Sequence, residues 1–545
     1  MTEMSAEWLP HLSTEIVSGV QGNSLDAYAV ALEGWRRGLT LRWHAKNSEK
    51  FNEITTWYVD QPGQLFSLSS KDKTHYFFRT RGDKVTNEAV AVGKDKERTK
   101  QVLKKKGVPT PEGRQFNENE SNDAIRQYVT SLGFPVVLKP TDGSFGRGVV
   151  TNIKNKQDLE FALNYVRSEL NIKNVIAEQY IPGEEYRIYV VGNQVVGAIN
   201  RIPANIVGDG VSSIDMLIAN KNKDRGLNPR LISCPLKVDE ETARFIGQQG
   251  YTKTSIPKRN EKIFLSKKSN ISFGGDPVDV LDELSEEIKE IAIHALKAVP
   301  GLEHGAVDII INSDESNKES GYVLELNPTA QIGSILYPLK GKSRDVPRAI
   351  IDYYFPETKA LYKKPYVYFD LHEVLTPIAS QAAIVTEVAN IQPKELIGKK
   401  YTIVGDVLSL AFHQKIKEKA IEQFLMGEIS KIDDDTIDIV VVGQDTETVE
   451  QFKQYITELD DISQVKEIDE EDWNQPIKLG FEIQGGNKSL LTELDKLEDD
   501  LIKTKKEQKK LKKQYHNMLR SNSWKVTEPI RKLGEAIKKL IKTRH

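Results

Sequence analysis

The chain of 545 residues lacks the features that mark secreted and membrane-spanning proteins. Cys234 is its one cysteine, which excludes an internal disulfide and fits a reducing compartment. The N-terminus has no basic flank followed by an apolar core, and no run of about 18 apolar residues occurs anywhere. We therefore expect a cytoplasmic protein that does not cross a membrane.

The chain also lacks the Gly-x-x-x-x-Gly-Lys-Ser/Thr sequence of a P-loop. Its glycine-dense segment, residues 141–148, lies between two predicted strands and not between a strand and a helix. This placement argues against both a P-loop and a dinucleotide-binding loop. Such a hairpin loop can turn its backbone N–H groups onto phosphates, although alone it is more typical of an ordinary glycine turn.

The composition is ordinary for a soluble protein, with 39% hydrophobic residues, 28% charged residues and a net charge of −3. The composition therefore does not indicate a binding partner. The length implies several domains, because single cores rarely grow beyond about 250 to 300 residues. Residues 521–545 are rich in Lys and Arg and contain only Glu528 and Glu535 as acidic residues. They form a basic tail with no aromatic residue but Trp524, which argues against nucleic-acid binding.

The patterns predict a multidomain α/β (α+β) protein. The expected parts are an N-terminal α/β lobe (1–93), a second α/β domain (94–356) with an insertion (203–275), a βαββαβ sandwich domain (365–485), a short coiled coil (486–520) and a basic amphipathic tail (521–545). The insertion has little periodicity, which is typical of a functional insertion or lid. A helix is predicted from Val278 to Ala298. The coiled coil is a candidate for self-association.

Three oxygen-bearing side chains occur on two neighbouring predicted strands. Glu325 and Asn327 are two residues apart in the strand-like run 322–328, so they face the same side. Asp308 lies on the preceding strand-like run, 305–311. Carboxylate and amide oxygens suit Mg²⁺, which in turn carries nucleotide phosphates. This cluster is the strongest functional signal in the chain.

Taken in order, the polar motifs of residues 94–356 resemble the ATP-grasp ligase superfamily. The residues that carry this resemblance are Lys96, Lys139, the 141–148 glycine loop, the 178–187 segment, Arg201, Asp308, Glu325 and Asn327. Within the superfamily, residues 201–210, 249–251 and 269–276 look like the ligase domains of cyanophycin synthetase and bifunctional glutathione synthetase.

The resemblance implies a role for each matching residue. The ATP phosphates would contact Lys96, Lys139, Gly143, Ser144, Gly146 and Gly148. The adenine edge would contact Glu178 and the Ile181 backbone. The ribose would contact Glu185. One or two Mg²⁺ ions, with Mn²⁺ as an alternative, would bind Asp308, Glu325 and Asn327. Arg187, Arg201 and Lys139 would be catalytic, the two arginines as a clamp on the acyl phosphate. In several relatives an arginine lies two residues before the first metal-binding aspartate, whereas this chain has Ala306 there.

The implied activity is that of an acid–amino-acid ligase (EC 6.3.2-like). The γ-phosphoryl group of ATP would pass to a carboxylate, and an amine would then attack the acyl phosphate to form an amide. The expected substrates are ATP, a carboxylate and an amino acid or peptide-like amine, in peptide or envelope-polymer synthesis. Their specificity is expected to lie in the lobe before residue 93 and in the 203–275 insertion.

The C-terminal sandwich resembles acylphosphatase, and residues 405–413 align with that family's phosphate cradle. His413 stands where the family has its catalytic arginine, Ser409 where the loop has glycine, and Lys431 where the catalytic asparagine is expected. These departures favour a degenerate binding or assembly domain over an active hydrolase.

Residues 521–531 resemble a short segment of proteins that build cell-surface glycans. The helix predicted after it has an apolar face and scattered lysines, so it would lie on anionic lipid or pack on a partner protein. The first option implies a peripheral location at the inner face of the cell membrane. Two alternatives to the ligase therefore stand: a hydrolase of acyl phosphates, and an ATP-binding scaffold for envelope glycan assembly.

Overall fold

The computed structural model describes residues 6–141, 148–313, 319–361, 367–391, 395–459 and 464–484, with Thr504 and Gln508. The chain divides into two compact units, residues 1–396 with 474–479 and residues 397–473 with 480–545. The predicted coiled coil and basic tail lie outside the described residues, apart from Thr504 and Gln508.

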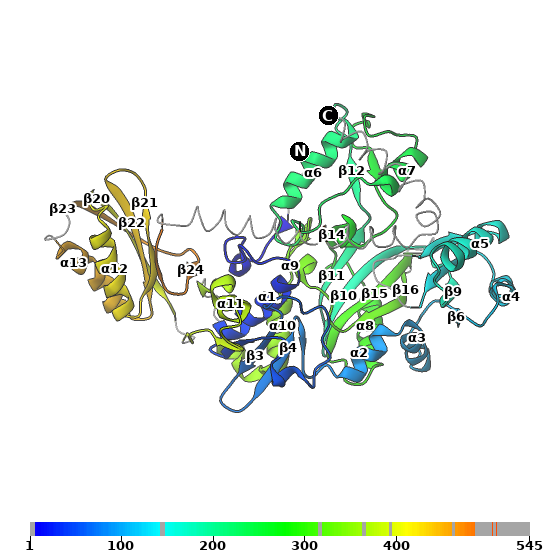
Figure 1. Ribbon diagram of the computed structural model, residues 1–545, viewed down its shortest axis with the longest axis horizontal. Coiled ribbons are helices and arrows are strands. Elements are labelled where there is room, and N and C mark those ends of the chain that lie inside the picture. Colours follow the sequence, from blue (N-terminus) through cyan, green and yellow to red (C-terminus); the bar gives the residue numbers. More distant parts are fainter. Residues whose placement is uncertain are drawn as a thin grey trace, which may run out of the picture. The chain divides into compact units, whose positions relative to one another are not determined.

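A five-stranded antiparallel sheet lies at the centre of the first unit (Figure 1). Its strands, in spatial order, are β14 (Asp276–Asp279), β11 (Gln194–Ile202), β10 (Glu184–Val191), β15 (His304–Ser313) and β16 (Glu319–Asn327). Helices α2 (Asn87–Lys94), α3 (Lys96–Lys105) and α8 (Glu286–Lys297) share one apolar core with alternate residues of β10 and β15. The residues between them, among them Arg187 and Asp308, therefore face the other side of the sheet.

A smaller sheet follows α3 in the chain. Its order is β6 (Gly113–Phe116), β9 (Val175–Gln179), β7 (Val136–Pro140) and β8 (Val150–Ile153). Helices α4 (Asn122–Leu132) and α5 (Lys156–Leu163), with the π-helix Asn164–Glu169, complete its core. This lobe carries Lys139 on β7 and Glu178 on β9.

The N-terminal sheet has the order β19 (Val385–Glu387), β2 (Thr40–His44), β3 (Leu65–Ser69), β4 (Thr74–Phe78) and β5 (Arg81–Gly82). Helix α1 (Asn23–Arg36) and helix α10 (Val346–Tyr354) pack together, and α1 also packs on β3. Strand β19 comes from the 365–485 segment, which the sequence analysis assigned to the C-terminal domain.

The 203–275 insertion has secondary structure and a core of its own. Strands β12 (Asn205–Val207) and β13 (Lys262–Phe264) pair, and helices α6 (Ile214–Gly226) and α7 (Glu240–Gln248) pack with them. The core consists of eight buried apolar residues: Ala204, Ile206, Ile214, Ile218, Leu236, Ile246, Ile263 and Leu265. The predicted helix Val278–Ala298 is wrong at its start, because β14 occupies residues 276–279 and α8 begins at Glu286.

The second unit has the predicted βαββαβ order. Its elements are β20 (Ile397–Asp406), α12 (Leu410–Glu422), β21 (Met426–Lys431), β22 (Thr436–Gly443), α13 (Thr446–Thr457) and β23 (Gln464–Asp472). A further strand, β25 (Phe481–Ile483), joins the sheet in the order β23-β20-β22-β21-β25. The two helices and alternate strand residues form one apolar core.

The remaining elements of the first unit are short. They are β1 (Ala6–Glu7), β17 (Gly341–Lys342), β18 (Val367–Tyr368), β24 (Ile477–Lys478), α9 (Gly333–Leu336), α11 (Leu371–Ala379) and the 3-10 helices Pro10–Leu12, Glu49–Phe51, Ile271–Phe273 and Pro356–Leu361. Strand β1 pairs with β17 and β18 with β24, both in parallel. Among the described residues, no helix combines the length and the apolar character needed to cross a membrane.

Buried His304 at the start of β15 should make folding sensitive to acid. Its Nδ1 lies 3.2 Å from the Tyr189 hydroxyl and its Nε2 3.2 Å from the Tyr354 hydroxyl. Burial, followed by the charge of Arg81, lowers its pKa from 6.5 to about 3. The unfolded state binds the proton first, so the stabilisation present above pH 6.5 is lost as the pH falls toward 3, at about 1.4 kcal/mol per pH unit.

The variant His304→Gln cannot take up this proton, so its free energy of unfolding should fall less steeply between pH 6.5 and 5. Urea unfolding at several pH values measures both slopes. His294→Gln, on the exposed side of α8, is the matched control and should keep the wild-type slope. Equal slopes for wild type and His304→Gln would contradict the prediction.

Candidate active site

The three predicted metal ligands lie together on the central sheet. Asp308 of β15 is the register partner of Glu325 on β16, and Asn327 follows two residues later on the same strand. The Asn327 amide donates through Nδ2 to Glu325 Oε1 at 3.1 Å. The sheet therefore brings two carboxylates and one amide to neighbouring positions.

Both predicted clamp arginines reach Asp308. Arg187, its register partner on β10, donates through Nε to Oδ1 and through Nη2 to Oδ2, each at 2.8 Å. Arg201 of β11 donates through Nη2 to Oδ2 at 3.0 Å. Ala306 is fully buried. In this chain the arginines next to Asp308, the first predicted metal ligand, thus come from β10 and β11 of the same sheet.

The two carboxylates of this pair have opposite pKa shifts. Burial would raise the pKa of Asp308, but Arg187 and Arg201 outweigh it and hold that pKa well below its ordinary value. Burial and the negative charge of Asp308 raise the pKa of Glu325. Arg187 opposes the rise in the pKa of Glu325 without cancelling it. One carboxylate of the pair thus has guanidinium partners, and the other forms no ion pair in the described part of the chain.

Glu185, predicted to bind ribose, is held by two side chains. It pairs with Arg201 and accepts a hydrogen bond from the Ser269 hydroxyl. Arg201 therefore connects Glu185 to Asp308. Ser269 belongs to the 203–275 insertion, so the insertion contacts the predicted nucleotide site. The sequence analysis assigned Ser269 no role of its own.

A second group of predicted residues surrounds Glu178. This carboxylate, 3% exposed, pairs with Lys139 of β7 and accepts a hydrogen bond from Lys100 Nζ at 2.6 Å. Gly113 on β6 is its register partner, and a Cβ there would lie 2.4 Å from the Glu178 Cβ. Asp95 caps α3, accepting from the Glu97 and Arg98 amides, and so fixes the start of the helix that carries Lys100.

The electrostatics of this group depend on the two lysines. Burial would raise the pKa of Glu178, but Lys139 and Lys100 outweigh burial and lower it. Burial lowers the pKa of Lys100. Lys100 was missed by the sequence analysis, although its distance of four residues from Lys96 places both on one face of α3.

The other predicted nucleotide contacts are placed as follows. Lys96 is the first residue of α3, and Ile181, 6% exposed, follows β9. Gly148 is buried just before β8 and has a φ of 77°, which favours glycine. The predicted contacts Gly143, Ser144 and Gly146 lie outside the described residues. The described site residues thus form two groups, one around Asp308 and one around Glu178.

The predicted phosphate cradle of the second unit keeps its loop and helix. Ser409 caps α12, accepting from the Phe412 amide. His413, in the position of the family's arginine, lies with Nε2 2.9 Å from the carbonyl oxygen of Val407 in the cradle loop. Lys431 pairs with Asp434 at 2.9 Å. Neither His413 nor Lys431 supplies the guanidinium group that the family's catalytic arginine carries.

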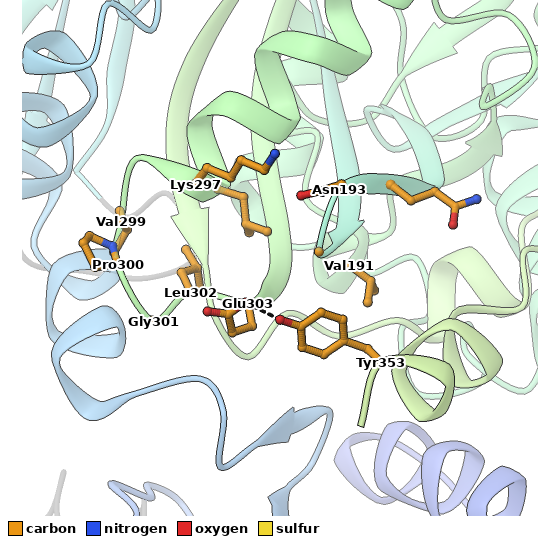
Figure 2. A pocket seen from close by; sticks show the side chains of 12 residues that line it. Val191, Asn193, Lys297, Val299, Pro300, Gly301, Leu302, Glu303 and Tyr353 are labelled. Carbon is orange, nitrogen blue, oxygen red and sulfur yellow. Dashed lines mark hydrogen bonds between the residues drawn. The ribbon is translucent and has the colours of Figure 1, made fainter. Parts of the chain in front are cut away.

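A separate pocket of about 550 Å³ lies at the β10–β11 turn. Figure 2 shows its lining, which includes Asn193, Lys297 and the hydrogen-bonded pair Glu303 and Tyr353. None of the predicted site residues lines this pocket. We assign no role in the predicted chemistry to it.

Two family models match the chain. The RimK-like ATP-grasp domain matches residues 93–210, and the acylphosphatase model matches residues 399–483. The first match includes Lys139, Glu178, Arg187 and Arg201. The second covers the cradle loop and Lys431.

Curated relatives match the same part of the chain. The glutathione biosynthesis bifunctional protein GshAB of Desulfotalea psychrophila is 30% identical over 299 residues, which is 54% of this chain and 38% of that protein. The Clostridium perfringens protein of the same name is 32% identical over 304 residues, with the same shares. Cyanophycin synthetase of Trichormus variabilis is 31% identical over 285 residues, 52% of this chain and 31% of the synthetase.

The solved structure of a bifunctional glutathione synthetase from Pasteurella multocida is 29% identical to this chain, with a TM-score of 0.43. The match covers 54% of this chain and 40% of the synthetase chain. The chain spans less than half the length of these relatives. It contains a RimK-like ATP-grasp domain and an acylphosphatase domain, and it is a homologue of ATP-grasp ligases.

Proposed function

We propose that this protein is an ATP- and Mg²⁺-dependent carboxylate–amine ligase that forms an amide bond through an acyl-phosphate intermediate. The observation that carries the proposal is the arrangement on the face of the central sheet opposite the core formed by α2, α3 and α8. Asp308 and Glu325 face each other there, and Arg187 and Arg201 donate to Asp308. Phosphoryl transfer needs such a cluster of oxygen ligands and cations.

The Glu178 group supplies the nucleotide half of the proposed site. Lys139, close to Glu178, would exchange that partner for an ATP phosphate, while Lys100 keeps the carboxylate ionised and in place. Glu178 and the Ile181 backbone would then accept and donate hydrogen bonds at the adenine edge. Glu185, held by Ser269 and Arg201, would accept from a ribose hydroxyl.

The donor set fits Mg²⁺. Asp308, Glu325 and Asn327 offer hard oxygen atoms, and burial together with the negative charge of Asp308 raises the pKa of Glu325, so a bound cation would be stabilising there. Among the described residues, no cluster of three His, Cys, Asp or Glu side chains could hold a metal alone. The ion would therefore take the Asn327 oxygen and ATP phosphates as further ligands. When bound, it would neutralise charge on those phosphates.

The reaction would run in two steps. A substrate carboxylate oxygen attacks the γ-phosphorus, the bond to the β-phosphate oxygen breaks, and ADP and an acyl phosphate form. A substrate amine then attacks the acyl carbon, inorganic phosphate leaves, and the amine loses a proton as the amide forms. Arg187 and Arg201 would stabilise the negative charge on the transferred phosphoryl group and on the acyl oxygen.

The relatives' names support the proposed substrate class. Glutathione is a peptide, and proteins named for its biosynthesis match this chain over about half its length. This supports an amino acid or peptide-like substrate. Membership of a pathway for peptides or envelope polymers stays a prediction, because the glycan-related segment at 521–531 lies outside the described residues.

The test is ADP release by the purified full chain with Mg²⁺ and ATP. A panel of amino acids, short peptides and amino sugars serves as acceptors, each with and without a carboxylic acid. We expect one combination to release ADP well above the ATP-only background and to yield an amide detectable by mass spectrometry. Absence of ADP release with every combination would contradict the proposal.

The same preparation separates the two alternatives. A hydrolase would cleave a generic acyl phosphate such as benzoyl phosphate without ATP, and the family match at 399–483 makes this the second candidate. His413 and Lys431 argue against it, since neither offers the bidentate guanidinium that a phosphoryl group needs. A scaffold would bind the ATP analogue AMP-PNP but release no ADP with any acceptor.

A further inference from the structure

The pocket at the β10–β11 turn is lined by an anion and a cation that do not pair with each other. Glu303 is half-buried and lies directly before β15, and Lys297 is the exposed last residue of α8. Both side chains line the pocket, yet neither forms an ion pair in the described part of the chain. A ligand that carries both charges could pair with each of them.

Figure 2 shows how the two charges are placed. Lys297 and Asn193 are drawn along one rim of the pocket, and the hydrogen-bonded pair Glu303 and Tyr353 along the opposite rim. The volume of about 550 Å³ falls within the roughly 300 to 1,000 Å³ that is typical of small-molecule sites. The pocket also has an apolar lining, formed by Val191, Leu296, Val299, Pro300 and Leu302.

The carboxylate of Glu303 has one oxygen held and one oxygen left for a ligand. The Tyr353 hydroxyl donates to Oε2, and in the described part of the chain no side chain donates to Oε1. Burial, followed by the hydrogen bond to Glu303, raises the pKa of Tyr353 to about 12, so the phenol remains a donor. Lys84 lies 4.7 Å from the centroid of the Tyr353 ring, but it donates to the Tyr353 carbonyl oxygen at 3.1 Å. An ammonium group in the pocket would supply the missing partner.

The pocket lies at one end of the two strands that carry Arg187 and Asp308. Val191 of β10 is the register partner of His304 on β15, the residue after Glu303. Arg187 and Asp308 are register partners on the same strands, four residues further along, which is about 13 Å away. A ligand that fixes this end of the two strands can therefore bias the positions of the arginine and the carboxylate.

We propose that this pocket is a regulatory site for a small zwitterion with an apolar side chain, an amino acid or a dipeptide. Its ammonium group would donate to Glu303, its carboxylate would accept from Lys297, and its side chain would contact the apolar lining. Occupancy would change the affinity of the nucleotide and metal site, and this part of the inference rests on the proposed function.

The first experiment measures binding to the full chain by isothermal titration without nucleotide. The probes are L-leucine and L-leucyl-L-leucine. Each is compared with its C-terminal amide, which lacks the carboxylate, and with its deamino analogue, which lacks the ammonium group. We expect one of the two zwitterions to bind about 10-fold or more tightly than both of its analogues. The preferred probe shows whether the site takes an amino acid or a dipeptide.

Variants test whether the zwitterion binds in this pocket. Glu303→Gln keeps an oxygen that accepts from Tyr353 but loses the charge, so the Kd of the preferred zwitterion should rise about 10- to 100-fold. Lys297→Gln removes an exposed charge and should raise that Kd about 3- to 10-fold. Lys289→Gln is the matched control on α8, because Lys289 pairs with Glu286 and does not line the pocket. It should leave the Kd unchanged, and thermal unfolding shows whether each variant is folded.

The second experiment measures the coupling between the two sites. The Kd of AMP-PNP with Mg²⁺ is determined with and without a saturating concentration of the preferred zwitterion. We expect a change of about fivefold or more, and the nucleotide should change the Kd of the zwitterion by the same factor. Glu303→Gln should lose this effect and Lys289→Gln should keep it. Neither measurement requires ligation.

The outcomes separate this inference from the proposed function. Zwitterions that bind no more tightly than their analogues, or binding that survives Glu303→Gln, would overturn the pocket assignment while ligation stands. An unchanged Kd of AMP-PNP at saturating zwitterion would overturn the regulatory role. Absence of ADP release with every acceptor would overturn the proposed function and leave the pocket result in place. If Glu303→Gln does not fold, Lys297→Gln and the wild-type comparison of zwitterions with their analogues decide.

Discussion

Replacing Glu325 with glutamine is expected to lower Mg²⁺-dependent ADP release about 100-fold while the chain still binds AMP-PNP. Glutamine keeps the shape and one oxygen but removes the negative charge opposite Asp308. Asp308 forms ion pairs with Arg187 and Arg201, whereas Glu325 forms no ion pair with a lysine or arginine in the described part of the chain. Removing it should weaken Mg²⁺ binding and leave the phosphoryl charge uncompensated.

Steady-state ADP release over a range of Mg²⁺ concentrations measures this effect, and fluorescence titration with a labelled ATP analogue measures binding. Glu319→Gln is the matched control on the same strand. Its carboxylate accepts from Ser285 Oγ at 2.7 Å at the other end of β16, and it should keep wild-type turnover. Wild-type rates for Glu325→Gln at limiting Mg²⁺ would contradict the assignment of a metal site to this strand.

The central strands could be predicted because their signal is local. In 305–311 Asp308 is the one charged residue within an apolar, β-branched run, and in the structure Val307 and Ile309 enter the helix-covered core while Asp308 faces the other side. The observed strand extends to residues 304–313, because strand ends depend on the neighbouring strand more than on their own side chains.

The elements that were missed depend on contacts distant in the sequence. Residues 276–279 form a strand because they pair with β11, yet Val278 and Val280 are equally compatible with the start of a helix. The eight buried apolar residues of the insertion are spread over two strands, two helices and the loops that flank them. Because most of its residues are polar, the hydrophobic periodicity of the sequence does not reveal the small core and predicts a loop.

The site residues show the same limit. The family pattern pointed to Glu178, Glu185 and Asp308, but it assigned no role to Lys100 or Ser269. Lys100 is 78 residues from Glu178, and Ser269 is 84 residues from Glu185. No local pattern encodes a pairing at that separation. Only the folded chain shows that α3 and the insertion hold the two carboxylates of the proposed nucleotide site.

Glu178 and Glu112 form a natural comparison, because each pairs with a lysine of α3. The Glu178 side chain is 4% exposed and lies between Lys100 and Lys139, whereas the Glu112 side chain is 67% exposed and pairs with Lys104 at 3.0 Å. Glu178→Gln should lower the free energy of unfolding of the nucleotide-free protein by about 3–5 kcal/mol, because it leaves two buried ammonium groups without an anion. Glu112→Gln should change it by less than about 1 kcal/mol.

Hydrogen exchange of peptides that cover β9, together with urea unfolding, measures the loss with and without Mg²⁺ and AMP-PNP. The analogue should restore part of the stability of Glu178→Gln, since its phosphates give Lys139 a new anionic partner, while Lys100 stays unpaired. A loss that nucleotide leaves unchanged would mean that Lys139 does not meet the phosphates. Equal losses for Glu178→Gln and Glu112→Gln would mean that burial adds nothing to the pair, and the Glu178 group could then not be the preorganised half of a nucleotide site.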